Sequence, residues 1–321
     1  MPSLKRRQFG QLAAASLTST VVAGISSKAV AQETATKQKI IYAVNLLSTS
    51  KTQNWENQTP PVELSTADLT TGKILSKVNQ LSLSVENLLS VPKNPRAFFL
   101  NDYSRISKAI MLKNGTLVIS TVSSTKDGHF NHLISISSIG SLTIPIFGAK
   151  KVLGFKRANQ TVESLLSLPN NQLLCLVGTE GVPPFSFRTL DLTTGQALAR
   201  DELALPSLPP THRFANLCQD LKGNIFATEI GSEGFPVLIS MNLQEKAIVT
   251  GNVKIKRLTP LSFEGRPLSY DLQDLTFSSD GQLHALAADG NRKNTAVYTV
   301  DVKSGKMGLV RKFAAEKFAF L

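Results

Sequence analysis

The sequence is poor in the residues that most often carry chemistry. Its 321 residues include two cysteines, four histidines and one tryptophan, Trp55. It contains no H-E-x-x-H, C-x-x-C, G-x-S-x-G or Walker A pattern. These are the usual motifs of zinc proteases, thiol oxidoreductases, serine hydrolases and P-loop nucleotide-binding proteins. The sequence therefore gives no motif that names a reaction.

The two cysteines, Cys175 and Cys218, both lie in apolar segments that read as strands. Free cysteine is among the most buried residue types, whereas export to an oxidising compartment would permit a disulfide. We expect two core thiols rather than a bond, and the sequence alone leaves the bond open.

The N-terminus has the three regions of an export signal. Lys5-Arg6-Arg7-Gln8-Phe9 is followed by a weakly apolar stretch, 12–25, and by Ala29-Val30-Ala31. This is the order of a charged region, a hydrophobic region and an A-x-A cleavage site. The paired arginines and the polar hydrophobic region favour the twin-arginine route. We expect residues 1–31 to be a signal peptide, residues 32–321 to be one domain, and the location to be periplasmic or extracellular.

Two features argue against a stable membrane anchor. The apolar stretch is short and diluted by Ser, Thr and Gly, whereas a spanning helix needs about 20 predominantly apolar residues. No cysteine stands at the cleavage point, so lipidation there is not expected.

The chain is basic, with a formal charge of +12, of which the signal contributes four positive charges. The remaining basic residues occur as scattered pairs without aromatic residues between them, so we expect no nucleic-acid partner. Lysines at strand edges discourage edge-to-edge association, and we expect a monomer. An anionic cell-wall or membrane surface is a weaker alternative.

One turn sequence recurs along the chain. D-L-T-T-G occurs at 68–72 and 191–195, and related turns occur at 136–140, 242–246 and 301–305. Four of these turns are each preceded, 19 to 21 residues earlier, by a turn of a second series that contains Gly or Asn. In such a turn the Asp accepts hydrogen bonds from the residues that follow, and the Gly supplies a positive φ.

Short strands lie between the turns, with four strands in each unit of 50 to 60 residues. This pattern predicts an all-β fold, a β-propeller. We expect strands at 165–168, 173–177, 185–190 and 197–199 in one unit, and at 217–219, 225–228, 237–241 and 247–250 in the next. The first unit lacks an inner strand before Ile40–Val44, and the C-terminal segment Lys317–Leu321 could supply it and close the ring.

The number of blades is left as five or six. Five turns of the D-x-x-T-G type support five four-stranded blades. Val85–Leu100 resembles the inner hairpin at Val162–Leu176, so it is either an insertion or a compressed sixth blade.

Ligands of propellers usually bind on the face that carries the loops between blades and between second and third strands. Four such loops place an acidic residue before glycine: Asp127, Glu180, Glu233 and Asp289. These carboxylates could form a Ca²⁺-binding ring, although an acid before glycine is ordinary turn chemistry, which we favour. His129 and His132 could form a surface metal site with Asp127, but we favour a solvated loop.

The starts of the inner strands should line the central channel. Counting back from the hairpin turns places polar residues at equivalent points: Lys108, Ser164, Asn216 and Asp274, with Glu86 and Asn87 in the extra hairpin. The long loop before Asp274 carries Glu264, Arg266, Tyr270 and Asp271, which we expect near the same face. A plainer alternative is that Asp274 caps its strand or pairs with a neighbouring arginine.

The segments "FANLCQDLKGNIFA" and "LQDLTFSSDGQLHALA" resemble those of the gluconolactonase and lactonase-like propellers, and the blade pattern resembles the superfamily with YVTN-type repeats. The resemblance implies that Asn216 and Asp274 hold a divalent metal that polarises a lactone carbonyl. Leu217 and Leu275 stand where that family usually has glycine. The single tryptophan does not match the repeated tryptophans of quinone-cofactor propellers.

Two hypotheses follow. The first is an exported binding or scaffold propeller without a cofactor, which holds a small-molecule or protein ligand on the loop-rich face through Asp274, Asn216 and Ser164. The alternative is a hydrolase of lactones or esters at the channel mouth, with Ca²⁺ or another divalent metal on Asp274 and Asn216. We favour the first because the metal-site pattern lacks its glycines, and fold alone does not decide between them.

Overall fold

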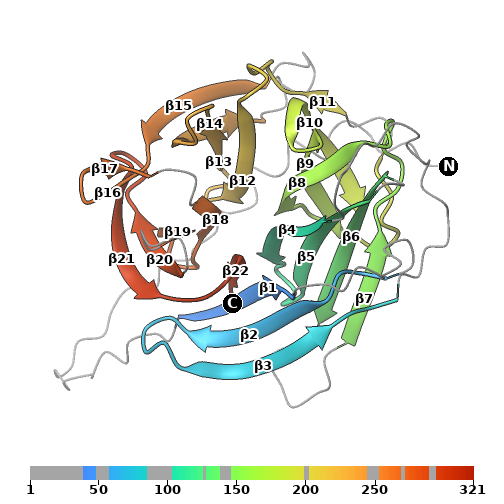
Figure 1. Cartoon of the computed structure of the whole chain (residues 1–321), viewed down its shortest axis with the longest axis horizontal. Coiled ribbons are helices and arrows are strands. Elements are labelled where there is room, and N and C mark those ends of the chain that lie inside the picture. Colours follow the sequence, from blue (N-terminus) through green and yellow to red (C-terminus); the bar gives the residue numbers. More distant parts are fainter. Residues whose placement is uncertain are drawn as a thin grey trace, which may run out of the picture.

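In a computed structural model of the chain, the described residues are 39–47, 58–84, 103–125, 128–137, 146–198, 202–243, 253–268, 272–288 and 294–321. These residues form strands and turns, which are arranged as five sheets around one axis (Figure 1). Each sheet contains a blade of four antiparallel strands, and one sheet carries two further short strands at its edge. The four strands are consecutive in the chain except in one blade, whose innermost strand is the C-terminal one. The predicted all-β propeller is therefore confirmed.

The strands of each blade are as follows, from the axis outward. Blade 1 contains β22 (Lys317–Phe320), β1 (Ile40–Leu46), β2 (Val62–Asp68) and β3 (Ile74–Leu81). Blade 2 contains β4 (Tyr103–Met111), β5 (Leu117–Thr125), β6 (Gly128–Ser137) and β7 (Ile146–Lys151). Blade 3 contains β8 (Gln160–Ser167), β9 (Gln172–Thr179), β10 (Val182–Asp191) and β11 (Leu203–Ala204). Blade 4 contains β12 (Arg213–Gln219), β13 (Ile225–Ile230), β14 (Pro236–Asn242) and β15 (Lys254–Pro260). Blade 5 contains β18 (Leu272–Phe277), β19 (Leu283–Ala288), β20 (Thr295–Val300) and β21 (Lys306–Lys312), with β16 (Ser262–Phe263) and β17 (Arg266–Pro267) at its outer edge.

Each interface between neighbouring blades has its own hydrophobic core. The five clusters of buried apolar residues join blades 1 and 2, 2 and 3, 3 and 4, 4 and 5, and 5 and 1. The middle strands β9, β13 and β19 are buried along nearly their whole length, because both of their faces pack against a blade. The apolar runs in the sequence thus reflect sheets that are covered on both sides.

The C-terminus closes the ring, as predicted. Strand β22 pairs with β1 in the register Val44↔Lys317 to Ile41↔Phe320, and Leu321 N donates to Ile40 O at 3.1 Å. Phe318 is fully buried in the cluster between blades 5 and 1. The closure joins the two ends of the described chain within one sheet.

The recurring turn is a structural device, also as predicted. Asp68 accepts hydrogen bonds from Thr70 N and Thr71 Oγ1, both at 2.8 Å. The glycines of three such turns have φ between 70° and 76°, at Gly72, Gly195 and Gly305. These turns also dock on the chain that leaves the preceding blade, since Leu153 N donates to Gly195 O and Ser262 N to Gly305 O, both at 3.0 Å. The repeat therefore serves both the turn and the blade interface.

Some predictions fall outside the described residues or need correction. The hairpin at Val85–Leu100, with Glu86 and Asn87, lies outside them, and the described residues form five blades. The strand predicted at 247–250 also lies outside them, and the fourth strand of blade 4 is β15. That strand is charged and largely exposed, so a search for apolar alternation missed it. Cys175 and Cys218 are free and buried in different clusters.

Candidate functional site

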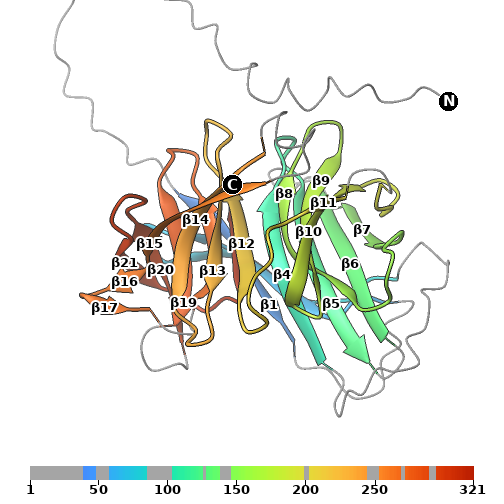
Figure 2. The same ribbon diagram turned by 90° about the horizontal axis from the view of Figure 1, so that it is seen from above.

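The innermost strands of the five blades form a closed ring around the axis. Strand β22 packs against β4, β4 against β8, β8 against β12, β12 against β18, and β18 against β22. Figure 2 shows the strands running between two faces of the molecule. Because the four strands of a blade are antiparallel, the strand ends that lead to the next blade and those that lead from the second to the third strand lie on one face, which we call the loop-rich face. From the sequence, this is the face on which we expect a ligand to bind.

All four polar residues predicted to line the axis lie at irregularities of the inner strands. The register shifts next to Lys108, Ser164 and Asp274, and Asn216 lies inside the shift of β12. All four residues are buried, with exposed fractions between 0% and 4%. A β-bulge changes the direction in which a strand presents its side chains. The constant distance in sequence between each of these residues and the following hairpin turn thus corresponds to a bulge that recurs in blades 2 to 5.

Two of these residues form a buried ion pair across the axis. Lys108 Nζ lies 2.5 Å from Asp274 Oδ1, and the two side chains are 2% and 0% exposed. Lys108 also donates to Leu275 O at 2.5 Å. The other carboxylate oxygen, Asp274 Oδ2, accepts from Phe318 N at 3.3 Å. Because β22 lies between β4 and β18 in the ring, the pair joins blades that are not neighbours.

Ser164 and Asn216 hold other contacts. Ser164 Oγ accepts from Leu217 N at 2.9 Å and so joins blades 3 and 4. Asn216, with φ of 56°, donates through Nδ2 to Thr228 Oγ1 at 3.2 Å within blade 4. These hydrogen bonds lie within blades 3 and 4, whereas Asp274 lies in blade 5 and contacts Lys108. Within the described residues, the structure therefore does not join the three predicted site residues into one cluster.

The arrangement does not fit a divalent metal on Asp274 and Asn216. The ammonium of Lys108 stands at the carboxylate where a metal would bind, and a divalent cation beside it would be repelled. Among the described residues there is no group of three or more His, Cys, Asp or Glu side chains placed to hold a metal ion. The loop residues Asp127 and Asp289 lie outside those residues.

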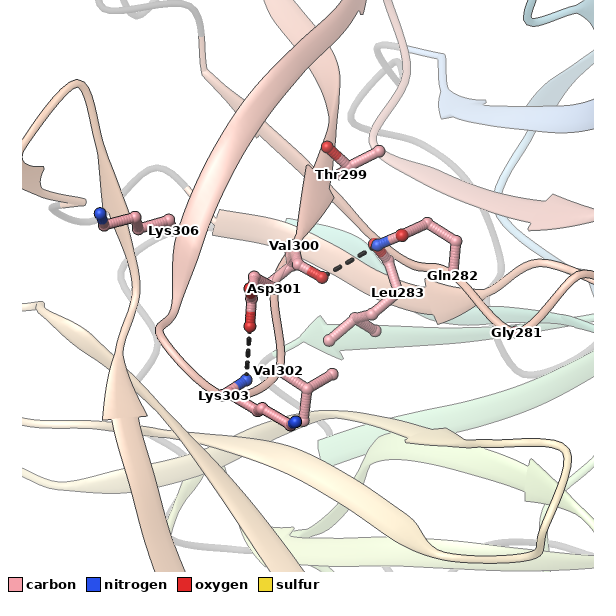
Figure 3. Close-up of a pocket in the computed structure, with 9 residues that line it drawn as sticks. All are labelled: Gly281, Gln282, Leu283, Thr299, Val300, Asp301, Val302, Lys303 and Lys306. Carbon is pink, nitrogen blue, oxygen red and sulfur yellow. Dashed lines mark hydrogen bonds between the residues drawn. The ribbon is translucent and has the colours of Figure 1, made fainter.

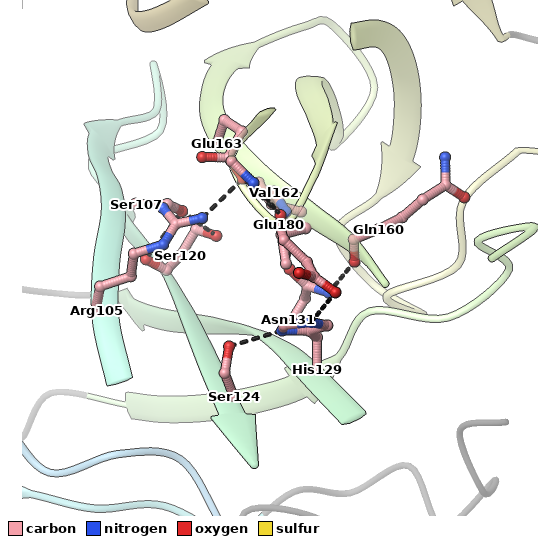
Figure 4. A network of polar contacts seen from close by, with 12 residues as sticks. Arg105, Ser107, Ser120, Ser124, His129, Asn131, Gln160, Val162, Glu163 and Glu180 are labelled. Atoms are coloured by element: carbon pink, nitrogen blue, oxygen red, sulfur yellow. Dashed lines mark hydrogen bonds and ion pairs between the residues drawn. The ribbon is translucent and has the colours of Figure 1, made fainter. Parts of the chain in front are cut away.

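Above the buried pair, toward the loop-rich face, a second ion pair is partly open to solvent. Arg105 Nη2 on β4 lies 2.7 Å from Glu163 Oε1 on β8 (Figure 4). The Arg105 side chain is 32% exposed, whereas that of Lys108, further along the same strand, is 2% exposed. Thr161 Oγ1 donates to Glu163 Oε1 at 2.6 Å and helps to hold the carboxylate. Solvent therefore reaches the axis as far as Arg105, a region that we call the mouth.

Lys317, the first residue of β22, is the other cation of the mouth. It is 9% exposed, and its ammonium donates to Gln273 O. The pKa of Lys317 is lowered to about 8, mainly by burial, and the charges of Lys108 and Arg105 contribute to this value against the opposing effect of Asp274. Sequence reasoning used this residue only to close the ring. The sequence feature that could have pointed to Lys317 is that it is the one charged residue of an otherwise apolar strand.

Three polar residues beside the mouth contact one another: Ser124, His129 and Glu180. Ser124 Oγ and His129 Nδ1 are hydrogen bonded at 2.6 Å, and His129 Nε2 lies 3.2 Å from Glu180 Oε1 of the next blade (Figure 4). Desolvation lowers the pKa of His129, although Glu180 opposes this effect. Ser124 is fully buried, so its hydroxyl cannot reach a substrate as a nucleophile must. We interpret the contact as one that joins blades 2 and 3.

This contact corrects the interpretation of His129 and His132 as parts of a solvated loop. Both lie in β6 and are at most 2% exposed. The glycine and polar residues around them are typical of a loop, but β6 is a long third strand covered by its neighbours. Glu180, which was considered for a Ca²⁺ ring, contacts His129, and Glu233 is exposed.

Two of the four loop residues expected near the same face as Asp274 lie elsewhere. Strand β16 pairs with β21, so Glu264 and Arg266 lie at the outer edge of blade 5 (Figure 1). Tyr270 and Asp271 lie outside the described residues.

A depression of about 500 Å³ lies on the opposite face, in blade 5 (Figure 3). Its polar groups already serve the local turns. Asp301 Oδ1 accepts from Lys303 N at 2.7 Å, and Gln282 Nε2 donates to Val300 O at 2.9 Å. We assign this depression no ligand.

No protein-family profile matches the sequence, and no curated protein matches it. The structure is similar to a protein of unknown function from Bacteroides caccae, with 11% identity, coverage of 89% of this chain and 99% of that chain, and a TM-score of 0.44. The calcium-binding protein regucalcin from Agrobacterium tumefaciens shows 11% identity, coverage of 84% and 75%, and a TM-score of 0.36. The aldose sugar dehydrogenase from Streptomyces coelicolor, in its PQQ-bound form, shows 11% identity, coverage of 85% and 85%, and a TM-score of 0.36. Similarity at this level carries no argument about ligand or activity. Among the described residues no helix is long and apolar enough to cross a membrane.

Proposed function

We propose that the protein is an exported, monomeric ligand-binding propeller that holds a small-molecule or protein ligand at the mouth. The observation that carries the proposal is the change in exposure along the axis. Arg105 is open to solvent, whereas the Lys108–Asp274 pair beneath it is buried. A ligand entering from the loop-rich face would meet polar groups of several blades and stop above the pair. Convergent polar groups of this kind are typical of small-molecule sites.

The proposal favours binding over metal-dependent hydrolysis. Asp274, the expected metal ligand, has a lysine partner, and Ser124 is buried beneath the surface. Elemental analysis of the purified protein distinguishes the two functions. We expect no stoichiometric divalent metal after exposure to Ca²⁺ and buffer exchange, and one tightly held equivalent would favour the hydrolase.

The binding proposal is tested by ligand-detected NMR with a panel of neutral, anionic and cationic fragments. Fragments that bind should compete with one another for the mouth, and Arg105→Gln should weaken their binding. Lys303→Gln, on the opposite face, is the control and should leave binding unchanged. If no fragment binds, or if all binding is insensitive to Arg105, the proposal is wrong.

Export has its own test, because the signal at residues 1–31 lies outside the described residues. The intact mass of the exported protein should begin at or near Gln32, and replacing both Arg6 and Arg7 by lysine should block export. Normal export of this double variant would exclude the twin-arginine route. Light scattering of the exported protein tests the expected monomer.

A further inference from the structure

We propose that the mouth binds a small anion, through a carboxylate or phosphate group held between Arg105 and Lys317. This inference rests on the proposed binding function and adds the chemical class of the ligand. It follows from how the charges around the axis are paired.

Three carboxylates of the described residues near the axis, Asp274, Glu163 and Glu316, are already engaged. Asp274 contacts Lys108, and Glu163 contacts Arg105. Glu316, next to Lys317 in sequence, accepts from Leu46 N at 3.0 Å on β1. Among the described residues no carboxylate lies within ion-pair distance of Lys317.

Both cations keep donors for a ligand. The Lys317 ammonium has three protons, and its one hydrogen bond within the described part of the chain goes to Gln273 O. Arg105 has five N–H donors, of which Nη2 contacts Glu163 while the side chain remains 32% exposed. The remaining donors of the guanidinium are suited to a carboxylate or phosphate group.

The two cations are close enough to affect each other. Strand β22 packs against β4, and the charge of Arg105 contributes to the lowered pKa of Lys317. A buried ammonium without a carboxylate partner is costly. An anion in the mouth would offset this cost and would raise the pKa of Lys317 toward its ordinary value.

Three probes test the inference: malonate, inorganic phosphate, and malonamide as the uncharged analogue of malonate. Isothermal titration of the purified protein at pH 7 should show saturable binding of malonate or phosphate and none of malonamide. Binding should weaken by at least about tenfold in Lys317→Met and in Arg105→Gln. Lys303→Gln, on the opposite face, should bind as the wild type does.

Lys317→Met should fold, because it replaces a buried charge by an apolar side chain of similar length, and its melting temperature should be at least that of the wild type. Malonate affinity should also fall as the pH rises past about 8, as Lys317 loses its proton among Asp274, Lys108, Arg105 and Glu316. Equal binding of malonamide, or unchanged binding of malonate by Lys317→Met, would overturn the inference. If neutral fragments bind at the mouth and no anion does, the inference fails and the proposed binding function stands. If nothing binds there, both fail.

Discussion

Lys108 and Asp274 are 166 residues apart in sequence, yet their charged atoms lie 2.5 Å apart in the centre of the ring. The pair joins blade 2 to blade 5 across the strand that closes the propeller. Phe318 of that strand also donates its backbone N–H to Asp274. Two residues that the sequence predicted to line the central channel, one of them as a ligand-binding residue, thus hold three blades together.

The turn glycines should be sensitive to alanine because of their neighbours as well as their φ. A Cβ at Gly195 would lie 2.4 Å from Lys151 O, and one at Gly305 would lie 2.1 Å from Pro260 O. Gly115 has φ of 80° and no atom within 4 Å of such a Cβ, so it is the matched control. We expect Gly115→Ala to lower the free energy of unfolding by about 1 to 2 kcal/mol. Gly195→Ala and Gly305→Ala should lower the free energy of unfolding by about 1 to 3 kcal/mol more than Gly115→Ala does. Urea unfolding measures all three, and equal losses would contradict the docking of the turns.

The closing strand should contribute strongly to stability. Phe318 is fully buried, whereas Leu321 is 53% exposed. Phe318→Ala should lower the free energy of unfolding by about 3 to 5 kcal/mol, and Leu321→Ala should change it little. Removal of Lys317–Leu321 should lower the melting temperature more than either substitution. A melting curve unchanged by this truncation would mean that the ring does not need β22.

His284 should make the protein acid-sensitive. It is 1% exposed and packs against Phe320 with ring centroids 4.7 Å apart. Desolvation lowers its pKa from 6.5 to about 4. Below pH 6.5 the unfolded state therefore binds a proton that the folded state does not, and stability falls as the pH drops to about 4, by about 3 kcal/mol from this residue.

The measurement is urea unfolding of the wild type and His284→Gln at pH 7, 5.5 and 4. Carboxylates add to the acid sensitivity of both proteins, so the difference between the two is the quantity of interest. The variant should lose less stability than the wild type between pH 7 and pH 4. Identical losses would show that His284 does not titrate as proposed.

The sequence predicted a closed β-propeller, although not the number of its blades, because local chemistry repeats from blade to blade. The Asp and Gly of the turns and the spacing between the two turn series are local features, and they predicted the blades and the equivalent polar positions of the inner strands. The apolar C-terminal segment predicted closure because one blade lacked an inner strand. Strand β15 was missed since its residues are charged and exposed, as an outer strand permits.

The site was less accessible to sequence reasoning. Counting from the turns found Lys108 and Asp274 at equivalent positions, but their contact depends on which strands face each other across the axis. The roles that we propose for Arg105 and Lys317 depend on the end of the axis that solvent reaches, which the sequence does not show. His129 was misplaced because a polar segment after a glycine resembles a loop, although two neighbouring blades bury it.

The central claim is that Asp274 is the structural partner of Lys108, which leaves recognition to the mouth above them. A double-mutant cycle of Lys108→Met, Asp274→Asn and the combined variant, followed by urea unfolding, tests it most directly. Each single substitution should lower the free energy of unfolding by about 3 to 5 kcal/mol, because it leaves one buried group without its partner. The combined variant should lose less than the sum of the two, with a coupling of more than about 1 kcal/mol. Losses that add to within about 0.5 kcal/mol would contradict the claim.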